Sequence, residues 1–471
     1  MNHRAIPVLL AALLTASCTV GPNYHRPNVA VPAAFHAPAE SGQAAAPASS
    51  FADLSWWEVF HDQQLQALIR TAMKQNYDLL LAAERITAAR ARVGITRSAQ
   101  FPQVAADADF SGGKNDQGAK SNLFTAVADA AFQLDFFGRF RRATEAARAQ
   151  LAATEDARQT VLLTLVSDVA SDYFLLRALD LQLHILEDTV KTQEDSVKLT
   201  ELRLKHGVAN RLDVLQARQV LDNANAQIPD LQRQIGQEED AINILLGGYP
   251  QDVPRGNALG TETPQGWVWS ESLPPELPAG LPSSLLERRP DIRASEQNLI
   301  AANADIGVAK AMFFPQISLM GSGGGATGHT VFGGTNLPAP PGIWSYGVGA
   351  SQPLFEGGYL SSNLRYAKSQ FSQALIGYRQ TIQKALGDVS DALIAYRRNH
   401  EVRERQEQSV KDLQESVSVS LMQYRGGTAN YLTVLDSQRS LLAAELTLAQ
   451  ARNNEYQGLV QLYKALGGGW K

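Results

Sequence analysis

One side chain in the sequence offers covalent chemistry, a thiol close to the amino terminus. Cys18 is the only cysteine among 471 residues, and it follows Arg4, an apolar run from 5 to 14 and two small residues. About ten apolar residues make a secretory signal, whereas a membrane-spanning helix needs about twenty. The pattern predicts a signal peptide over residues 1–17 that ends directly before the thiol.

Cys18 in this context is similar to the lipid acceptor of bacterial lipoproteins. Thr15 stands where such sequences usually carry leucine, and an ordinary signal peptide with an incidental cysteine is the alternative. A diacylglycerol on Cys18, with a third chain on its amine, would anchor the protein firmly to a membrane. By the same resemblance, Thr19 rather than aspartate after the cysteine favours sorting to the bacterial outer membrane.

Other spacings that suggest chemistry lack the context that the chemistry needs. Gly323, Gly325 and Gly328 form a G-x-G-x-x-G, and residues 113–121 read GKNDQGAKS, but neither joins a strand to a helix. We expect both stretches to be flexible loops between strands. The eight histidines show no metal-ligand spacing and no G-x-S-x-G occurs, so we expect no enzyme, no metal site and no cofactor beyond the lipid.

Composition excludes further classes. Lys plus Arg total 42 against 47 for Asp plus Glu, which gives no basic excess for nucleic acid. No later apolar run reaches the length of a spanning helix. If the chain crosses a membrane, it is therefore expected to do so through a β-barrel.

The strongest feature is an internal duplication. The Phe-Pro-Gln at 101–103 recurs at 314–316, an offset of 213, and Gly-Val-Ala-Asn at 207–210 matches Gly-Thr-Ala-Asn at 427–430, an offset of 220. We expect five segments, which are a signal peptide 1–17, a lipidated tether 18–50, a first repeat 51–250, a Pro-rich linker 251–282 and a second repeat 283–471.

Each repeat reads as a helix, two strands, a long helix, a sharp turn and a returning helix. Residues 139–206 contain neither proline nor glycine, so the helix predicted there would be about 100 Å long. Such helices must pack on others. The second repeat shows a coiled-coil spacing at Val410, Leu413, Val417, Leu421 and Tyr424. A periplasmic coiled-coil scaffold is thus an alternative, which the strands argue against.

The predicted strands alternate apolar and polar residues. In 124–136 the even positions are apolar and most odd positions are polar, and 103–110 repeats this alternation. Trp344 and Tyr346 alternate with small residues in the second repeat, as in an aromatic girdle at a membrane surface. Four strands cannot close a barrel, whereas two chains would supply eight strands with a filled interior and three would supply twelve with a bore.

Seven stretches of the chain resemble TolC-type outer-membrane factors, and among them the NodT-type lipoproteins of resistance–nodulation–division (RND) multidrug efflux systems. They are CTVGPNYHRP from Cys18, LDFFGRFRR from Leu134, LPSSLLERRPDIRASEQ from Leu281, VAKAMFFPQISL from Val308, SQPLFEGG from Ser351, YRGGTANYLTVLDSQ from Tyr424 and LYKALGGGW from Leu462.

This resemblance implies an α+β membrane protein with a TolC-like fold. Three copies would form a homotrimer, with a 12-stranded β-barrel in the outer membrane lipid and a long α-helical barrel in the periplasm. The trimer would meet a periplasmic adaptor (membrane fusion) protein and, through it, an inner-membrane RND-type transporter. The expected function is passive export of drugs and other small molecules. A protein-secretion duct and a lipid-anchored surface enzyme are the remaining alternatives.

The resemblance also implies a periplasmic gate. Asp213 and Asp436 match acidic family positions at the periplasmic constriction, and Tyr424 matches a tyrosine of the same network. A ring of carboxylates would favour cations. The alternative is that the two acids merely begin helices, where the helix dipole favours negative charge.

Two departures from the family pattern weaken a salt-bridge latch at the second turn. Thr433 replaces a carboxylate and Ala429 replaces an arginine, so Arg211 or Arg425 would have to substitute.

The turns themselves resemble the adaptor-contacting turns of the family. The expected contact residues are Gly207, Val208, Gly427 and Thr428.

Overall fold

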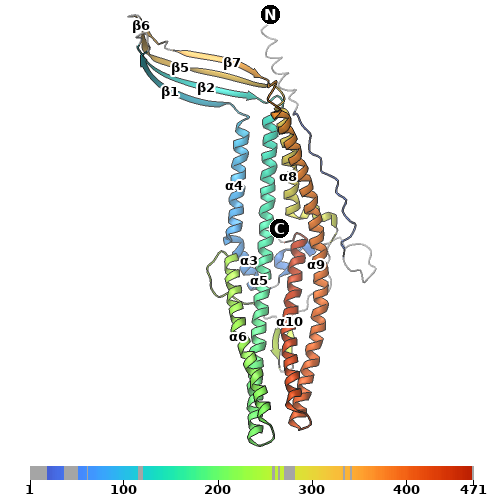
Figure 1. Ribbon diagram of the computed structural model, residues 1–471. Coiled ribbons are helices and arrows are strands. Elements are labelled where there is room, and N and C mark those ends of the chain that lie inside the picture. The colour runs from blue at the N-terminus through green and yellow to red at the C-terminus, as the bar shows by residue number, and fades with distance from the viewer. Residues whose placement is uncertain are drawn as a thin grey trace. The chain divides into compact units, whose positions relative to one another are not determined.

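The chain is represented by a computed structural model that describes residues 19–36, 51–60, 62–114, 120–256, 260–263, 266–269, 280, 282–332, 335–339 and 342–468. Cys18 and the signal peptide expected before it lie outside these residues. In chain order (Figure 1) the elements are η1 Phe51–Asp53, α2 Trp56–Val59, α3 Gln63–Gln75, α4 Tyr77–Ser98, β1 Gln103–Lys114, β2 Lys120–Leu134, α5 Arg139–Lys205, α6 Arg211–Leu245, β3 Gly260–Thr263, β4 Gly266–Trp269, η2 Pro282–Ser284, α7 Leu285–Arg288, α8 Pro290–Ala311, β5 Gln316–Phe332, β6 Thr335–Pro338, β7 Ile343–Ser351, α9 Tyr359–Arg425 and α10 Tyr431–Ala465.

Two compact units share these elements. The sheet unit comprises Met1–Val29, Glu84–Asp156 and Arg293–Thr381, and the helical unit comprises Ala30–Ala83, Ala157–Ile292 and Ile382–Lys471. Each unit takes residues from both expected repeats.

All strand pairs of the main sheet are antiparallel, in the order β1-β2-β5, with β7 and β6 both pairing β5. The register places Val104 opposite Ala130 and Phe110 opposite Phe124. It also places Tyr346 opposite Gly321 on the same face. Because side chains alternate across a strand, the apolar positions of all four long strands share one face. This confirms the predicted alternation.

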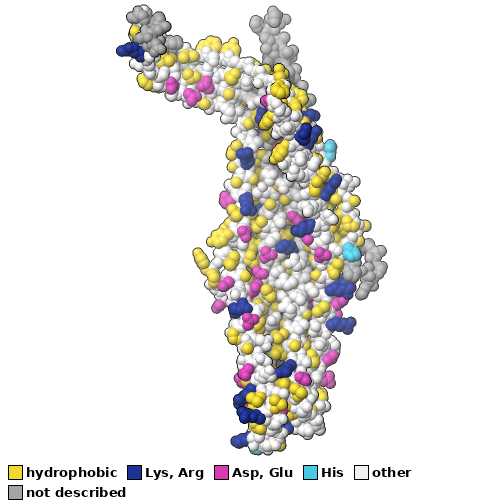
Figure 2. Space-filling model, in the orientation of Figure 1, with side chains coloured by type: hydrophobic (Ala, Val, Ile, Leu, Met, Phe, Trp, Pro, Cys, Tyr) yellow, Lys and Arg dark blue, Asp and Glu magenta, His cyan; other side chains and the backbone are white. Residues whose placement is uncertain are grey.

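The apolar face of the sheet is bare in a single chain. Val104 is 74% exposed, Phe110 70% and Tyr346 82%, and Figure 2 shows hydrophobic side chains over the sheet. The opposite face is polar, with Gln133 donating to Gln316 at 2.7 Å. A contiguous exposed apolar surface marks a site that contacts lipid or another protein.

One local expectation was wrong, and the structure adds detail at three other places. The glycines at 323–328 lie inside β5 rather than in a loop. Gly323 stands opposite Trp344 of β7 in the strand register. The stretch 113–121 ends β1 and begins β2, with residues 115–119 outside the described part. The Pro-rich linker contains the hairpin β3–β4, and β6 is an additional short strand.

The long helices confirm the predicted pattern. α5 and α9 each have 67 residues, and α6 and α10 each have 35. In the helical unit α6 runs back along α5 and α10 along α9 (Figure 1). No helix of the described residues has both the length and the apolar composition that crossing a lipid bilayer requires.

The chain from 19 to 26, which we name the strap, belongs to the sheet unit and packs there against α8 and the residues before α5. Val20 donates its N–H to the carbonyl of Phe137 at 3.1 Å. Asn303 of α8 donates to the carbonyl of Pro22 at 3.0 Å. Gly21 lies so close to Gly307 of α8 that a Cβ on it would stand 2.5 Å from the Gly307 Cα. The first described residues are therefore firmly held.

Candidate gate at the helical turns

The two helix reversals have the same geometry. Gly207 has φ 72° and Gly427 has φ 77°, a left-handed conformation that favours glycine. In the first turn Val208 donates to the carbonyl of Arg203 at 2.9 Å, and in the second Thr428 donates to the carbonyl of Gln423 at 2.9 Å. These bonds close both helices in the Schellman manner.

The helices that return from these turns begin differently. Asn210 caps α6, where its Oδ1 accepts from the N–H of Asp213 at 3.0 Å and its own N–H donates to the Asp213 carboxylate at 3.2 Å. This reciprocal pair is a capping box. Asn430 caps α10, and Thr433 supplies both an N–H and a hydroxyl to its Oδ1. Thr433 therefore occupies the position where the first repeat has Asp213.

The two predicted gate acids have different surroundings. Asp213 is half-buried and takes part in the capping box, which is the helix-start role considered as the alternative. Asp436 is exposed on α10, one turn further along, and no hydrogen bond or ion pair holds it among the described residues. The Asp436 carboxylate is therefore accessible from outside the chain.

Tyr424 is buried, with 4% of its surface exposed. Its ring centroid lies 5.4 Å from that of Tyr431. The guanidinium of Arg203 lies 4.4 Å from the Tyr424 ring centroid, and Arg203 Nη1 donates to the Tyr424 carbonyl at 3.3 Å. This stacking joins α5 to α9 and α10 beside the turns.

All four long helices supply an apolar cluster around these two rings, which we name the tip cluster. It consists of Val197, Ala217, Val220, Tyr424, Tyr431, Val434 and Leu435. Burial, together with the negative charge of Asp213, raises the pKa of the Tyr424 phenol and raises that of Tyr431 to about 12. Both phenols therefore stay protonated at neutral pH, and the Tyr424 hydroxyl has no hydrogen-bond partner within the described chain.

The sequence did not indicate Arg203 or Tyr431. Arg203 of α5 stacks on Tyr424 of α9. The spacing of residues along a single helix does not reveal a contact between two helices. The expected substitutes, Arg211 and Arg425, are exposed and form no ion pair among the residues the structure describes. An exposed ion pair between Arg218 of α6 and Glu201 of α5, with an N–O distance of 2.5 Å, joins the two helices of the first hairpin.

A buried charge network further along the same helices was also missed. Arg403 of α9 pairs with Glu455 of α10 at 3.0 Å and with Glu407 at 2.9 Å, and His400 contacts the other Glu455 oxygen at 2.6 Å. Arg452 pairs with Glu407. Buried charges are tolerated only when paired, so this network fixes α10 against α9. The described residues contain no cluster of three or more side chains suited to a metal ion.

The sequence profile described as "Outer membrane efflux protein" matches residues 68–248 and 281–468. The starts differ by 281 − 68 = 213 and the ends by 468 − 248 = 220, which are the offsets found within the sequence.

Curated relatives match over the whole chain. The chain is 34% identical to the "Probable efflux pump outer membrane protein TtgC" of Pseudomonas putida, over 100% of this chain and 96% of that protein. It is 33% identical to the "Cation efflux system protein CusC" of Escherichia coli, over 99% of each.

Solved structures agree with this. A CusC structure superposes with a TM-score of 0.82 at 32% identity and covers 96% of this chain and 100% of that one. The open state of the Neisseria gonorrhoeae MtrE outer membrane channel gives a TM-score of 0.82 at 31% identity, over 96% and 99%.

Proposed function

Since the chain belongs to the outer membrane efflux protein family, we propose that it passively exports small molecules that a periplasmic adaptor and an inner-membrane RND-type pump deliver. Its fold is TolC-like. It is an outer-membrane channel of a tripartite efflux system and not an enzyme. The two curated relatives named above carry the names of an efflux pump and of a cation efflux system, so the substrates proposed here are small molecules or ions rather than proteins.

The sheet is the observation that supports a homotrimer most strongly. Its outer strands, β1 and β7, each have one edge without a partner among the described residues. An open edge and a bare apolar face are both tolerated if copies join edge to edge within a bilayer. Three copies would supply twelve long strands, enough for a barrel with a bore.

The turns at the ends of the helical hairpins are proposed to meet the adaptor. Val208 is 65% exposed at the first turn, and Gly207, Gly427 and Thr428 complete the pair of surfaces. Their matching geometry gives an adaptor two similar contacts for every chain.

We propose that the gate lies beside these turns. Asp213 and Asp436 would present negative charge to the constriction, and Tyr424 would hold the helices closed through the tip cluster. The stacking of Arg203 on Tyr424 supports this, because the two residues connect separate helical hairpins.

The amino-terminal segment is proposed to be lipidated on Cys18 after removal of residues 1–17. The packing of the strap supports an anchor, since the residues directly after Cys18 are fixed to the unit that carries the apolar sheet. We propose that the mature chain divides into a tether, a first repeat, a linker and a second repeat, at residues 18–50, 51–250, 251–282 and 283–471.

Single-channel recording tests the central proposal. The purified, lipidated protein is reconstituted in planar bilayers, and its mass in detergent is measured in parallel. Stepwise conductance from a species of three chains is expected. A monomer that produces no conductance would contradict the proposal and favour a coiled-coil scaffold.

A further inference from the structure

Helices α4 and α5 lie side by side in the sheet unit and run in opposite directions. Part of the way along them, Arg90 Nη2 of α4 lies 3.2 Å from Glu155 Oε1 of α5. Nearer the sheet, just beyond the end of α4, Gln100 Nε2 donates to the Thr144 hydroxyl at 2.5 Å. Residue numbers rise along one helix as they fall along the other, so these two contacts fix which positions face each other.

Between the two contacts, the helices bring two arginines together. Arg97 lies seven residues after Arg90 on α4, and Arg148 lies seven residues before Glu155 on α5. Seven residues are close to two full turns, so each arginine projects from the same face of its helix as the charged residue of the ion pair. Where Arg90 meets Glu155, two turns further from the sheet, a cation meets an anion. Where Arg97 meets Arg148, two cations meet.

This arginine pair has no counter-charge. Both side chains are exposed, and neither forms an ion pair within the part of the chain that the structure describes. Glu145, one turn from Arg148, already pairs with Arg142 at 2.8 Å. Two like charges side by side repel each other, and an anion that binds both of them replaces this repulsion with attraction.

The second repeat contains an equivalent pair. At the offset of 213 Arg97 corresponds to Lys310 of α8, and at the offset of 220 Arg148 corresponds to Lys368 of α9. Both lysines are exposed and form no ion pair among the described residues. Arg365, one turn before Lys368, adds a third exposed cation. Each repeat thus presents a cation pair of its own.

The first cation pair lies next to the apolar face of the sheet. Arg97 is six residues before Gln103, where β1 begins, which is about 9 Å at helical rise. Its guanidinium lies 5.5 Å from the ring centroid of Phe101, an exposed aromatic between the helix and the strand. The polar layer of a bilayer extends about 5–8 Å beyond the hydrocarbon on each side. With the sheet in a bilayer, the pair would therefore lie among or beside the headgroups.

We propose that each cation pair binds the phosphate of a phospholipid headgroup that has a net negative charge. Phosphate oxygens can accept hydrogen bonds from both cations at once. A zwitterionic headgroup such as phosphatidylcholine fits less well, because its ammonium group would approach two cations. This inference rests on the proposed insertion of the sheet in a membrane, and it adds two lipid sites for every chain.

Native mass spectrometry of the purified full-length protein in detergent tests this. Dimyristoylphosphatidylglycerol and dimyristoylphosphatidylcholine are titrated separately, and inorganic phosphate is added as a soluble competitor. Binding of the phosphatidylglycerol is expected to be more than ten-fold tighter than that of the phosphatidylcholine. Equal binding of the two lipids would overturn the proposal, and so would displacement of the phosphatidylglycerol by an equal concentration of inorganic phosphate.

Conductance of the same preparation in planar bilayers separates this inference from the proposed function. Protein that conducts but shows no lipid preference would contradict the lipid sites alone. Protein that neither conducts nor enters bilayers would contradict the proposed function as well.

Charge-neutral variants locate the first site. Arg97→Gln with Arg148→Gln is expected to halve the amount of phosphatidylglycerol bound at saturation. Arg92→Gln with Arg379→Gln removes as many exposed arginines from α4 and α9, further from the sheet, and is expected to leave binding unchanged. Equal effects of the two double variants would mean that net charge alone attracts the lipid, which would refute the site.

A charge reversal gives an independent check in a folded protein. Arg148→Glu places a carboxylate opposite Arg97, in the arrangement that Arg90 and Glu155 already show. We expect a thermal midpoint at least as high as that of the wild type, because attraction replaces repulsion, together with the same loss of half the bound phosphatidylglycerol. A variant that binds as much of this lipid as the wild type would exclude the arginine pair as its site.

Discussion

The guanidinium of Arg203 lies 4.4 Å from the centre of the Tyr424 ring and connects the first helical hairpin to the second. The contact spans 221 positions of sequence. Substitution of Arg203 therefore tests whether the gate is held closed by packing between the hairpins rather than by charge alone.

Arg203→Leu should loosen the closed arrangement. The substitution removes a partly desolvated cation–π contact, which contributes about 1 kcal/mol, and the bond to the Tyr424 carbonyl. We expect a lower thermal midpoint and more frequent channel opening in planar bilayers. Arg211→Leu, at an exposed arginine without an ion pair in the described chain, is the control. Identical behaviour of the two variants would exclude a special role for Arg203.

Charge at the gate can be separated from helix capping. Asp213→Asn with Asp436→Asn removes both charges but keeps an oxygen that can accept from Asn210 in the capping box. We expect this double variant to open the channel and to lose cation preference. Asp213→Ala should in addition lower helix stability by about 1 kcal/mol, because the capping box loses one hydrogen bond. A channel that stays closed and cation-selective in the Asn variant would assign Asp213 to capping only.

Stability should fall as pH rises between about 4 and 7. Burial and the neighbouring Asp168 raise the pKa of Asp172 to about 6, and burial and Asp172 raise that of Glu238 to about 7. The folded chain therefore binds more protons than the unfolded chain in this window, so folding is favoured below it.

Neutral replacements should remove this pH dependence. Asp172→Asn with Glu238→Gln is expected to raise the unfolding free energy at pH 8 by about 1–2 kcal/mol, once the partial solvent access of both side chains is allowed for. Thermal midpoints at pH 5 and pH 8 measure it. Glu194→Gln with Asp222→Asn, at exposed acids, should leave the wild-type slope unchanged. A wild-type midpoint that rises from pH 5 to pH 8 would contradict the assignment.

The two faces of the sheet should respond differently to a positive charge. Val348→Lys places a charge on the bare apolar face of β7, at a cost of about 2–4 kcal/mol if the site lies near the bilayer midplane. Ser345→Lys places the same charge on the polar face. We expect only the first to reduce the amount of heat-modifiable protein in outer membranes. Equal loss in both variants would mean that the faces have been assigned wrongly.

Bulky residues at the turns should block coupling without disturbing assembly. Val208→Trp and Thr428→Trp are expected to abolish dye efflux in cells that lack another outer-membrane channel, because the adaptor surface would no longer fit. Trimers on size-exclusion chromatography should persist. Normal efflux in both variants would place the adaptor contact elsewhere.

Much of the fold could be predicted because its signals are periodic. The proline-free and glycine-free stretch 139–206 predicted α5, and the repeat offset then placed α9 and α10. Alternation in 124–136 predicted the apolar face of β2. These patterns repeat along one element, so they need no knowledge of its neighbours.

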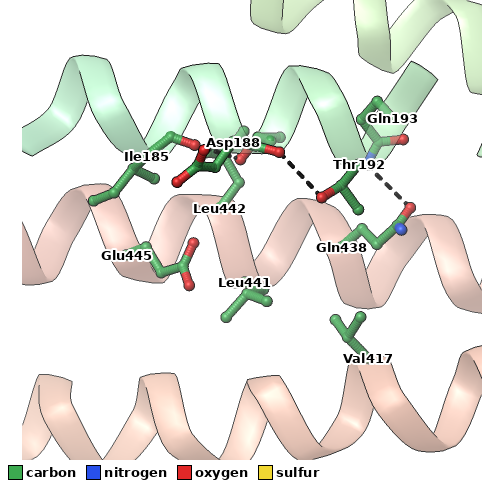
Figure 3. A pocket seen from close by; sticks show the side chains of 10 residues that line it. Ile185, Asp188, Thr192, Gln193, Val417, Gln438, Leu441, Leu442 and Glu445 are labelled. Carbon is green, nitrogen blue, oxygen red and sulfur yellow. Dashed lines mark hydrogen bonds between the residues drawn. The ribbon is translucent and has the colours of Figure 1, made fainter. Parts of the chain in front are cut away.

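The remainder depends on contacts between elements. The glycines of β5 suggested a loop because their pairing with Trp344 and Tyr346 of β7 cannot be read from the spacing of the glycines themselves. Arg203 and Tyr431 gain their surroundings only when separate hairpins meet, and so does Gln193 of α5, whose amide donates to Gln438 of α10 (Figure 3). The spacing of residues within either hairpin does not predict these contacts between the hairpins.

The strap limits how far a lipid could reach. Val20 is hydrogen-bonded to Phe137 and Gly21 packs closely against Gly307, so only Thr19 lies between Cys18 and a fixed point. Two residues extend at most about 7 Å. An acylated Cys18 would therefore act as a short tether that fixes how deeply the protein sits in its membrane. Inserting even a few residues after Cys18 would lengthen the tether and make this depth variable.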